Sequence, residues 1–423
     1  MTALTDPALC TAADLDLFSG TGSQASLDIS RSSLPAPLRP GALGILDISE
    51  FFGETTGGVR TYLLEKARYV ERRPELRQVL VVPGARDSIH ETSGVRCYRL
   101  RGPSVPTQKP YRFMLATQST SRIVAHERPD LIEVGSAWFA PWLVHLATRC
   151  IDVPAVWFYH SHFPRIIAPH PATTGKIRHG ISRLAWRYVR QLSRLVQATL
   201  APSDFVVTEL QREGVERIHR VNLGVDLERF HPRRRGYAAE TRRTLGLPQG
   251  PLALFVGRIA RDKEVDLLVE SWPAVEHRTG TKLVLAGDGP SRRRLLQQSG
   301  SDRFIWLPFE ANRDRLADLM AAVDLYAAPF SLETCGLSAL EALASGTPVL
   351  SADRGGVAES VTRSSAGTTF QSGNRGALRE AAIRMMTEPL AELGIRGRRY
   401  VEAHHGWDRV LDQLFAVYRS ILR

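Results

Sequence analysis

The chain has 423 residues, of which 43% are hydrophobic and 23% charged, a composition typical of a globular protein and not of a disordered or fibrous one. A chain of this length usually divides into two domains. The formal net charge of +11 indicates an anionic partner or a local basic cluster. The four cysteines are scattered, which argues against a disulfide framework or a structural zinc site and favours a reducing compartment.

Apolar residues form no run that would span a membrane. The most apolar region, residues 131–159, is interrupted by Glu133, Arg149 and Asp152, whereas a spanning helix needs about 20 consecutive apolar residues. The first residues include Asp6, where a signal peptide would need a basic region followed by an apolar run. The sequence therefore predicts a cytoplasmic protein.

The first half of the chain alternates between strand and helix patterns. Residues 1–42 are rich in Ser, Thr, Ala, Pro and Gly and are predicted to be a disordered tail. A strand over 44–48 then leads through a glycine-containing loop into a helix over 60–73. Further apolar runs lie at 78–82, 130–134, 155–159, 197–200 and 220–223. This alternation predicts a doubly wound, mostly parallel sheet domain over residues 43–230.

The same alternation restarts after a polar, basic interval. Predicted strands lie at 252–256, 282–286, 304–307, 325–328 and 348–351. They indicate a second doubly wound domain over 231–405, and a last helix over 406–423 is expected to pack back at the domain junction. The predicted fold class is therefore α/β, with two Rossmann-like domains facing each other across a cleft. In such sheets, ligands bind at the carboxyl ends of the strands.

Two loops at strand ends in the second half have the composition of a diphosphate site. Gly257 and Arg258 follow one strand, and Lys263 comes five residues after the arginine. Arginine can bind phosphate oxygens as a fork and lysine as a point charge, although a Gly-Arg pair alone is more often solvated surface. Gly287 and Gly289 follow the next strand. That loop is equally compatible with a plain turn, because the third glycine of a dinucleotide fingerprint is absent.

A third loop carries two glutamates. Glu333 precedes a helix predicted to start near Gly336, where unpaired backbone N–H groups and the helix dipole suit a phosphate. Glu341 lies inside that helix among Ala and Leu residues. A carboxylate in such surroundings is costly unless it has hydrogen-bonding partners, and a ribose diol would be one. The alternative is that Glu341 reaches solvent along the edge of the helix.

Together, these motifs resemble one family, the retaining glycosyltransferases of family four with the GT-B fold. The family has a glycine-arginine loop with a following lysine, then a Gly-rich loop. It also has two glutamates separated by seven residues before an Ala-Ser-Gly-Thr-Pro-Val segment, which here is residues 344–349. The order and spacing are comparable from residue 44 onward.

The resemblance implies a role for each charged residue. Arg258 and Lys263 would bind the donor diphosphate and stabilise the leaving group. Glu333 would contact the transferred sugar, and Glu341 the ribose hydroxyls. No residue is implied to act as a nucleophile, because the resemblance implies front-face attack with a phosphate oxygen taking the proton of the acceptor.

The resemblance also implies roles for backbone groups and for one histidine. Gly336 and Leu337 would offer N–H groups to phosphate. Gly57 and Gly58 look like the family's first glycine-rich loop, near the diphosphate and the acceptor, and His160 looks like the strand-end histidine that reaches the sugar.

His160 and His162 form an H-x-H pair that could indicate a metal site. No Cys or carboxylate ligand is near them in the sequence, and the resemblance implies no metal and no cofactor other than the nucleotide-sugar co-substrate. His162 is interpreted as structural. Two departures from the family pattern, Cys335 in place of an aromatic residue and Glu264 in place of a glycine, leave the donor identity open.

The predicted reaction is transfer of a hexose, of mannose or glucose type, from a UDP- or GDP-linked donor to a lipid-linked or polysaccharide acceptor, with retention of configuration. Two alternatives are a catalytically inactive GT-B binding or regulatory protein and a sugar-nucleotide epimerase. The paired glutamates favour the transferase.

A basic stripe accounts for part of the net charge. The segment 165–203 contains seven Lys or Arg and no Asp or Glu. Four arginines in it are spaced four, three and four apart, which places them on one side of a helix; they are Arg183, Arg187, Arg190 and Arg194. The stripe fits a solvated helix face or an anionic membrane surface at the inner face of the plasma membrane. Nucleic acid ranks last, because no nucleic-acid-binding motif accompanies it.

Overall fold

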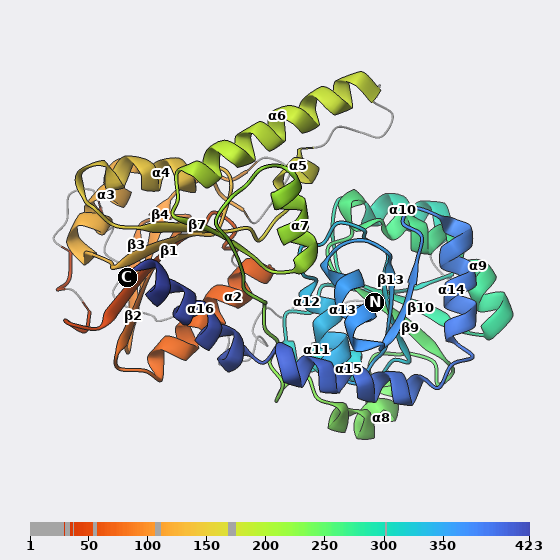
Figure 1. Cartoon of the computed structure of the whole chain (residues 1–423). Coiled ribbons are helices and arrows are strands. Elements are labelled where there is room, and N and C mark those ends of the chain that lie inside the picture. Colours follow the sequence, from red (N-terminus) through yellow and green to blue (C-terminus); the bar gives the residue numbers. More distant parts are fainter. Residues whose placement is uncertain are drawn as a thin grey trace. The chain divides into compact units, whose positions relative to one another are not determined.

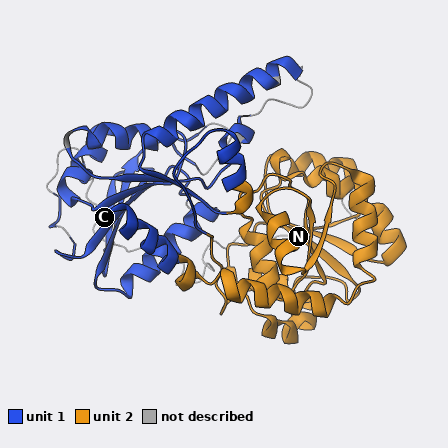
Figure 2. Ribbon diagram, viewed as in Figure 1, with its two compact units in different colours: residues 1–202, 207–221, 411–423 blue, residues 203–206, 222–410 orange. Residues whose placement is uncertain are grey.

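The computed structural model describes residues 29, 34–36, 38–53, 57–105, 111–167, 175–300 and 303–423. Most of the tail predicted over residues 1–42 lies outside them. The chain groups into two compact units (Figure 2). Unit 1 comprises residues 1–202, 207–221 and 411–423, and unit 2 comprises residues 203–206 and 222–410.

Unit 1 contains, within the described residues, an eight-stranded sheet of order β3-β4-β2-β1-β5-β6-β7-β8 (Figure 1). Its strand pairs are parallel, except that β3 runs antiparallel to β4 at one edge. The strands are β1 (Leu43–Ile48), β2 (Leu76–Gly84), β3 (Ser88–Thr92), β4 (Val95–Arg101), β5 (Leu131–Val134), β6 (Ala155–Phe158), β7 (Ala198–Ala201) and β8 (Ile218–Arg220).

Most strands of unit 1 form at the predicted apolar runs, and the two missed strands are the edge strand β3 and its neighbour β4. β3 and β4 were not predicted, because polar and charged residues alternate with apolar ones along them. In β4, the buried Arg96 is neutralised by Glu127 at 2.6 Å. The strand predicted over 220–223 is β8, which begins and ends earlier in the chain.

The helices of unit 1 include a short connection, α5, and one long helix, α6. They are α2 (Gly58–Glu71), α3 (Thr117–Glu127), α4 (Ala140–Ala147), α5 (Phe163–Ile166), α6 (Gly175–Arg194) and most of α7 (Asp204–Arg212). The last helix, α16 (Trp407–Ile421), contributes residues 411–421 to this unit. Its Leu411, Leu414, Phe415 and Tyr418 are buried, so apolar burial anchors it here.

A buried ionic network joins the sheet of unit 1 to α2 and α16. Lys66 Nζ lies 2.6 Å from Asp47 Oδ1 and donates to the Tyr418 hydroxyl at 2.7 Å. The Tyr62 and Tyr418 hydroxyls both donate to the carboxylate of Glu133. Burial, opposed by the positive charge of Lys66, raises the pKa of Glu133. Because each buried charge has partners, the network can hold α2 against the sheet without the cost of an unpaired buried charge. The first turn of α2 begins at the predicted glycine-rich loop.

Unit 2 contains, within the described residues, a six-stranded parallel sheet of order β11-β10-β9-β12-β13-β14 (Figure 1). The strands are β9 (Leu252–Val256), β10 (Lys282–Ala286), β11 (Ile305–Leu307), β12 (Leu325–Ala328), β13 (Val349–Ala352) and β14 (Gly367–Phe370). β9, β12 and β13 are central and almost wholly buried, as expected for a parallel sheet covered on both faces. The edge strand β14 was not predicted.

Helices cover both faces of this sheet. They are α8 (Ala238–Thr244), α9 (Val265–Thr279), α10 (Arg292–Ser299), α11 (Arg313–Ala321), α12 (Leu337–Ala344), α13 (Gly356–Ser364), α14 (Arg375–Met385) and α15 (Leu390–His404). Short 3-10 segments lie at Pro232–Tyr237 and Arg261–Lys263.

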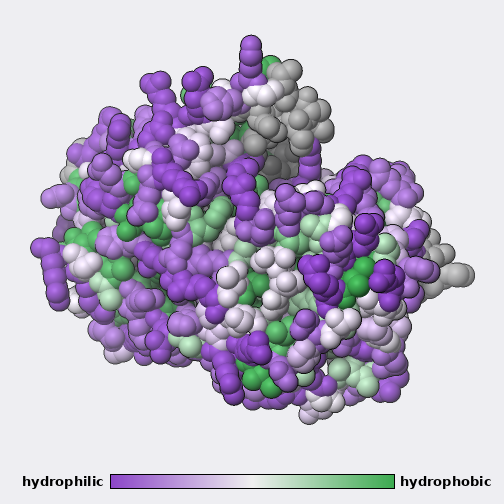
Figure 3. Space-filling model, turned by 45° about the vertical axis from the view of Figure 1, so that its right-hand side comes forward, coloured by the Kyte–Doolittle hydropathy of each residue, from purple (hydrophilic) through white to green (hydrophobic). Residues whose placement is uncertain are grey.

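The face shown in Figure 3 is mostly hydrophilic, with small apolar patches separated by polar residues. No helix in the described part of the chain is long and apolar enough to cross a membrane.

Candidate functional site

The two glycine-containing loops after β9 and β10 pack backbone against backbone. A β-carbon on Gly287 would lie 2.0 Å from the carbonyl oxygen of Gly257, and one on Gly289 would lie 2.4 Å from that of Ile259. The N–H of Ile259 donates to the carbonyl of Asp288 at 2.8 Å. Glycine is therefore required at 287 and 289 by the close approach of the two loops, which brings the ends of β9 and β10 together.

The two predicted phosphate-binding cations have different partners. Arg258 is about half exposed and forms an ion pair of 2.7 Å with Asp262, four residues on. Lys263, at the end of the 3-10 segment, forms an ion pair with Glu333, 70 residues away, and its Nζ lies 4.9 Å from the centre of the Phe330 ring. The structure therefore brings Lys263 and Glu333 together, while Arg258, five residues before Lys263, is half exposed and pairs with Asp262 in its own loop.

Helix α12 begins directly after the loop that carries Glu333. Gly336 precedes the helix with φ of 84°, and a β-carbon there would lie 2.2 Å from Val357 Cγ2. No described side chain caps this N-terminus, so the backbone N–H groups at Leu337 and beyond begin a helix that favours an anion. A lysine and a helix N-terminus thus flank Glu333.

The second glutamate has a partner that the sequence analysis did not identify. Glu341 is only 5% exposed, and its Oε1 lies 2.5 Å from a guanidinium nitrogen of Arg313 in the first turn of α11. The guanidinium carbon of Arg313 also lies 4.9 Å from the centre of the Phe230 ring. Glu341 is therefore a buried carboxylate neutralised by a half-buried arginine. No local pattern distinguishes Arg313 from the surface arginines of the chain.

Tyr326 links two elements of the site, and the sequence analysis did not identify it either. Its hydroxyl lies 2.7 Å from Ser338 Oγ and 3.1 Å from the carbonyl of Val256. It thereby connects the first turn of α12 to the end of β9. Burial raises the pKa of Tyr326 well above its ordinary value, so the hydroxyl stays protonated.

In unit 1, His160 follows β6 and lies between aromatic rings. Its ring stacks on that of Phe158 with centroids 4.1 Å apart, and the Tyr62 ring lies 4.9 Å away. Burial, reinforced by the positive charge of Lys66, lowers the pKa of His160 to about 3. The imidazole is therefore neutral at physiological pH. His162, two residues on, is buried and packs against Tyr159 and Trp186.

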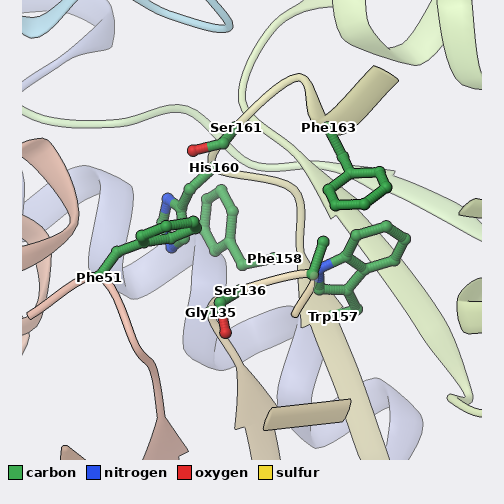
Figure 4. Close-up of a pocket in the computed structure, with 9 residues that line it drawn as sticks. Phe51, Gly135, Ser136, Trp157, Phe158, His160, Ser161 and Phe163 are labelled. Atoms are coloured by element: carbon green, nitrogen blue, oxygen red, sulfur yellow. The ribbon is translucent and has the colours of Figure 1, made fainter. Parts of the chain in front are cut away.

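His160 lines a recess at the carboxyl ends of β1, β5 and β6 (Figure 4). Aromatic rings dominate its walls, and two serines add hydroxyl groups. The lining residues are Phe51, Gly135, Ser136, Ala137, Trp157, Phe158, His160, Ser161 and Phe163. Most of these rings are buried, so the recess offers a sugar mainly its polar groups and the partly exposed ring of Phe51.

Glu50 holds one wall of this recess. Its carboxylate accepts hydrogen bonds from Ser136 Oγ at 2.6 Å and from the N–H of Phe139 at 2.8 Å. Burial raises the pKa of Glu50 despite these bonds.

The predicted glycine-rich loop is near the start of α2: Gly57 has φ of 126° and Gly58 is the first helical residue. Residues 54–56 lie outside the described residues.

Two family models match the chain. Residues 56–229 match the model described as Glycosyltransferase Family 4, and residues 250–388 match the model described as Glycosyl transferases group 1. Together they cover most of the described chain and include each candidate residue above except Glu50 and Phe51.

Curated relatives and solved structures are similar to this chain over most of its length. A GDP-mannose-dependent alpha-mannosyltransferase of Mycobacterium tuberculosis is 27% identical over 380 residues, which is 88% of this chain and 96% of the relative. A GDP-mannose-dependent alpha-(1-6)-phosphatidylinositol dimannoside mannosyltransferase of the same species is 29% identical over 76% of this chain and 82% of the relative. The sucrose-phosphate synthase of Thermosynechococcus elongatus has the same fold, with a TM-score of 0.73, 21% identity and coverage of 89% of this chain and 99% of that one. The chain therefore belongs to glycosyltransferase family 4: it has the GT-B fold and is a glycosyltransferase that transfers a hexose from a nucleotide sugar.

Proposed function

We propose that this enzyme transfers a mannosyl group from GDP-mannose to a lipid-linked acceptor, with retention of the anomeric configuration. The observation that carries the nucleotide-sugar site is the grouping of Lys263, Glu333 and the start of α12 in unit 2. The names of the two mycobacterial relatives support GDP-mannose as the donor.

In this proposal, the donor diphosphate binds where positive charge is fixed. Lys263 and the N–H groups at Gly336 and Leu337 stabilise the negative charge that grows on the leaving diphosphate. Arg258, half exposed and paired with Asp262, exchanges that partner for phosphate. Glu341 accepts hydrogen bonds from the ribose hydroxyls, and Arg313 lies against its carboxylate. These groups supply the charge stabilisation, so the proposal includes no metal ion.

Transfer then proceeds on one face of the sugar. The bond between the anomeric carbon and the diphosphate oxygen breaks, the bond to the acceptor oxygen forms, and the acceptor proton passes to a phosphate oxygen. Glu333 orients the sugar and does not attack it, because its carboxylate is paired with Lys263. A trapped covalent adduct between the sugar and Glu333 would contradict this mechanism.

The acceptor binds, in this proposal, at the recess of unit 1. The partly exposed ring of Phe51 offers an apolar surface to the C–H face of a ring such as mannose or inositol, while Trp157 and Phe163 are buried (Figure 4). Neutral His160 contacts a hydroxyl without introducing a buried charge, which suits an uncharged acceptor group.

We further propose that α6 attaches the enzyme to an anionic membrane surface. The N-terminal part of α6 extends beyond the rest of unit 1 (Figure 2). Ile177 and Leu184 are 56% and 67% exposed on α6. Arg183 and Arg187, on either side of Leu184, are exposed too, as is Arg194 at the end of the helix. Arg190 differs, because it is half-buried and lies 3.4 Å from Glu213. Exposed apolar and basic side chains on one helix are typical of interfacial binding.

The donor proposal is tested with purified full-length protein and three nucleotide sugars: GDP-mannose, UDP-glucose and ADP-glucose. We expect GDP-mannose to raise the melting temperature, since a ligand at about 100 times its Kd adds about 2.7 kcal/mol of stability. The shift should be much smaller for Glu341→Gln. The matched control is Asp318→Asn. Asp318 lies on α11 and forms an ion pair with Arg234, so GDP-mannose should still raise the melting temperature of this variant.

The reaction itself is tested with labelled GDP-mannose and membrane lipid extracts, and the product anomer is read by NMR. An α-linked product confirms retention, because the donor is an α-linked nucleotide sugar. If no nucleotide sugar binds at millimolar concentration, the proposed transfer reaction fails, and a catalytically inactive binding protein becomes the favoured alternative. Release of an epimerised nucleotide sugar without acceptor would instead identify an epimerase.

A further inference from the structure

Glu264 occupies a backbone conformation that favours glycine. It lies between the 3-10 segment Arg261–Lys263 and α9, with φ of 49° and ψ of 31°. In this left-handed region, a β-carbon crowds the following carbonyl, so residues other than glycine are uncommon there. This conformation costs free energy, which contacts of the glutamate side chain can offset.

The Glu264 side chain binds the loop that carries Glu333. Its Oε1 accepts a hydrogen bond from the Ser331 hydroxyl at 2.7 Å and another from the Ser331 N–H at 3.1 Å. Both donors face a carboxylate, and such charge-assisted bonds are stronger than neutral ones. Consecutive residues therefore hold the same loop at two points, Lys263 at Glu333 and Glu264 at Ser331.

The opposite side of this loop is also fixed. The N–H of Gly356 donates to the Glu333 carbonyl at 2.8 Å. A β-carbon on Gly355 would lie 3.2 Å from the Ser331 carbonyl oxygen, and one on Gly356 would lie 2.4 Å from that of Thr334. The loop thus packs against the start of α13 on one side, and the Glu264 carboxylate provides the polar contact on the other.

We propose that Glu264 is a positioning residue for the sugar end of the donor site. Its carboxylate fixes Ser331 and thereby the carboxylate of Glu333, two residues on, against Lys263. The inference rests on the proposed function, because Glu333 is there the residue that contacts the transferred sugar. It adds a residue that touches neither sugar nor diphosphate and that holds the loop through its side chain.

Hydrogen exchange on the ligand-free, full-length protein tests the clamp without any substrate. Glu264→Gly removes the carboxylate and relieves the strained backbone, so the variant should fold. We expect faster amide exchange at Ser331 and the residues up to Glu333, and a smaller increase in Glu264→Gln, whose amide oxygen can still accept. Ser365→Gly is the matched control, because Ser365 has φ of 48° at an exposed helix end in the same unit. Unchanged exchange at Ser331 in Glu264→Gly would overturn the proposal.

Calorimetry with GDP-mannose and with GDP tests the consequence for the site. In Glu264→Gly, we expect the Kd of GDP-mannose to rise about tenfold, or roughly 1.4 kcal/mol, while the Kd of GDP stays the same. Ser365→Gly should change neither. An equal rise for both ligands, or for neither, would overturn a specific role at the sugar end. If the wild-type protein does not bind GDP-mannose, the donor proposal fails, and hydrogen exchange alone then decides the role of Glu264.

Discussion

Arg313 and Glu341 form an ion pair of 2.5 Å in which the carboxylate is buried and the guanidinium is one-quarter exposed. The pair joins the first turn of α11 to the middle of α12. It explains how a glutamate can lie among Ala and Leu side chains, because burial of a carboxylate without a partner would be costly.

We therefore expect Arg313→Met to destabilise the protein by about 2 kcal/mol, since it leaves a buried carboxylate without its charged partner. Denaturation in urea measures the loss. The double variant Arg313→Met with Glu341→Gln should recover part of it. Asp262→Asn is the control: its pair with Arg258 is half exposed, so the cost should be below about 1 kcal/mol. A cost for Arg313→Met as small as that of the control would contradict the prediction.

Lys263 should matter for catalysis more than for stability. Lys263→Met removes a fixed positive charge beside Glu333, so kcat for transfer from GDP-mannose should fall by about 100- to 1000-fold. Lys263→Arg keeps the charge with a different shape and should lose less. Lys282→Met is a matched control, because Lys282 forms an exposed pair with Glu276 elsewhere in unit 2. Equal rates for Lys263→Met and this control would rule out the assigned role.

Gly287 should not tolerate a β-carbon. In Gly287→Ala, the new methyl group would lie 2.0 Å from the Gly257 carbonyl oxygen, so the loops after β9 and β10 must separate. We expect a loss of about 1–3 kcal/mol together with weaker nucleotide binding. Gly250→Ala meets no atom within 4 Å and should change neither property. Thermal melting with and without GDP-mannose distinguishes the two, and a Gly287→Ala variant that behaves like Gly250→Ala would refute the packing argument.

His160 should remain neutral well below its ordinary pKa of 6.5. Its folded-state pKa is lowered to about 3, so between pH 6.5 and pH 3 the unfolded chain binds a proton that the folded chain does not. Stability from this group is therefore complete above pH 6.5 and is lost as the pH falls. An NMR titration of the imidazole measures the pKa directly.

The same shift predicts a difference between variants. From pH 7 to pH 5, wild type should lose about 1–2 kcal/mol more stability than His160→Phe, which keeps a ring against Phe158 but does not titrate. Equal pH dependence of urea denaturation in the two proteins would show that His160 does not contribute.

Leu184 should control membrane attachment. Leu184→Asp places a negative charge between exposed arginines on α6, so binding to vesicles of phosphatidylglycerol and phosphatidylcholine should decrease strongly. Arg187→Gln should cost about 1 kcal/mol of binding and reduce the salt dependence. Arg190→Gln is the comparison, because this arginine lies beside Glu213, and its effect should be smaller. Co-sedimentation measures all three, and wild-type protein that stays in the supernatant would refute the proposal.

The sequence by itself determined the elements and the chemical types at the strand ends. β9 and β10 coincide with the predicted runs over 252–256 and 282–286, because a central parallel strand is apolar on both faces and is bounded by turn residues. The predicted start of α12 near Gly336 is also confirmed, because the glycine before the helix and the apolar residues within it are local signals. The edge strands β3 and β14 were not predicted. One side of an edge strand meets solvent, so polar and apolar residues occur together along it.

Only the tertiary structure decided which side chains are partners. Glu341 pairs with Arg313, 28 residues away, and Glu264 binds Ser331, 67 residues away. In the sequence, Arg313 resembles any exposed arginine and Glu264 appears only as a departure from a glycine. Helical and strand periodicities are set by neighbours within a few residues, whereas hydrogen-bond and ion-pair partners depend on which strand ends and helix starts meet in the folded sheet. The residue types of the donor site could therefore be predicted from the sequence, while the pairs that hold them in place could not.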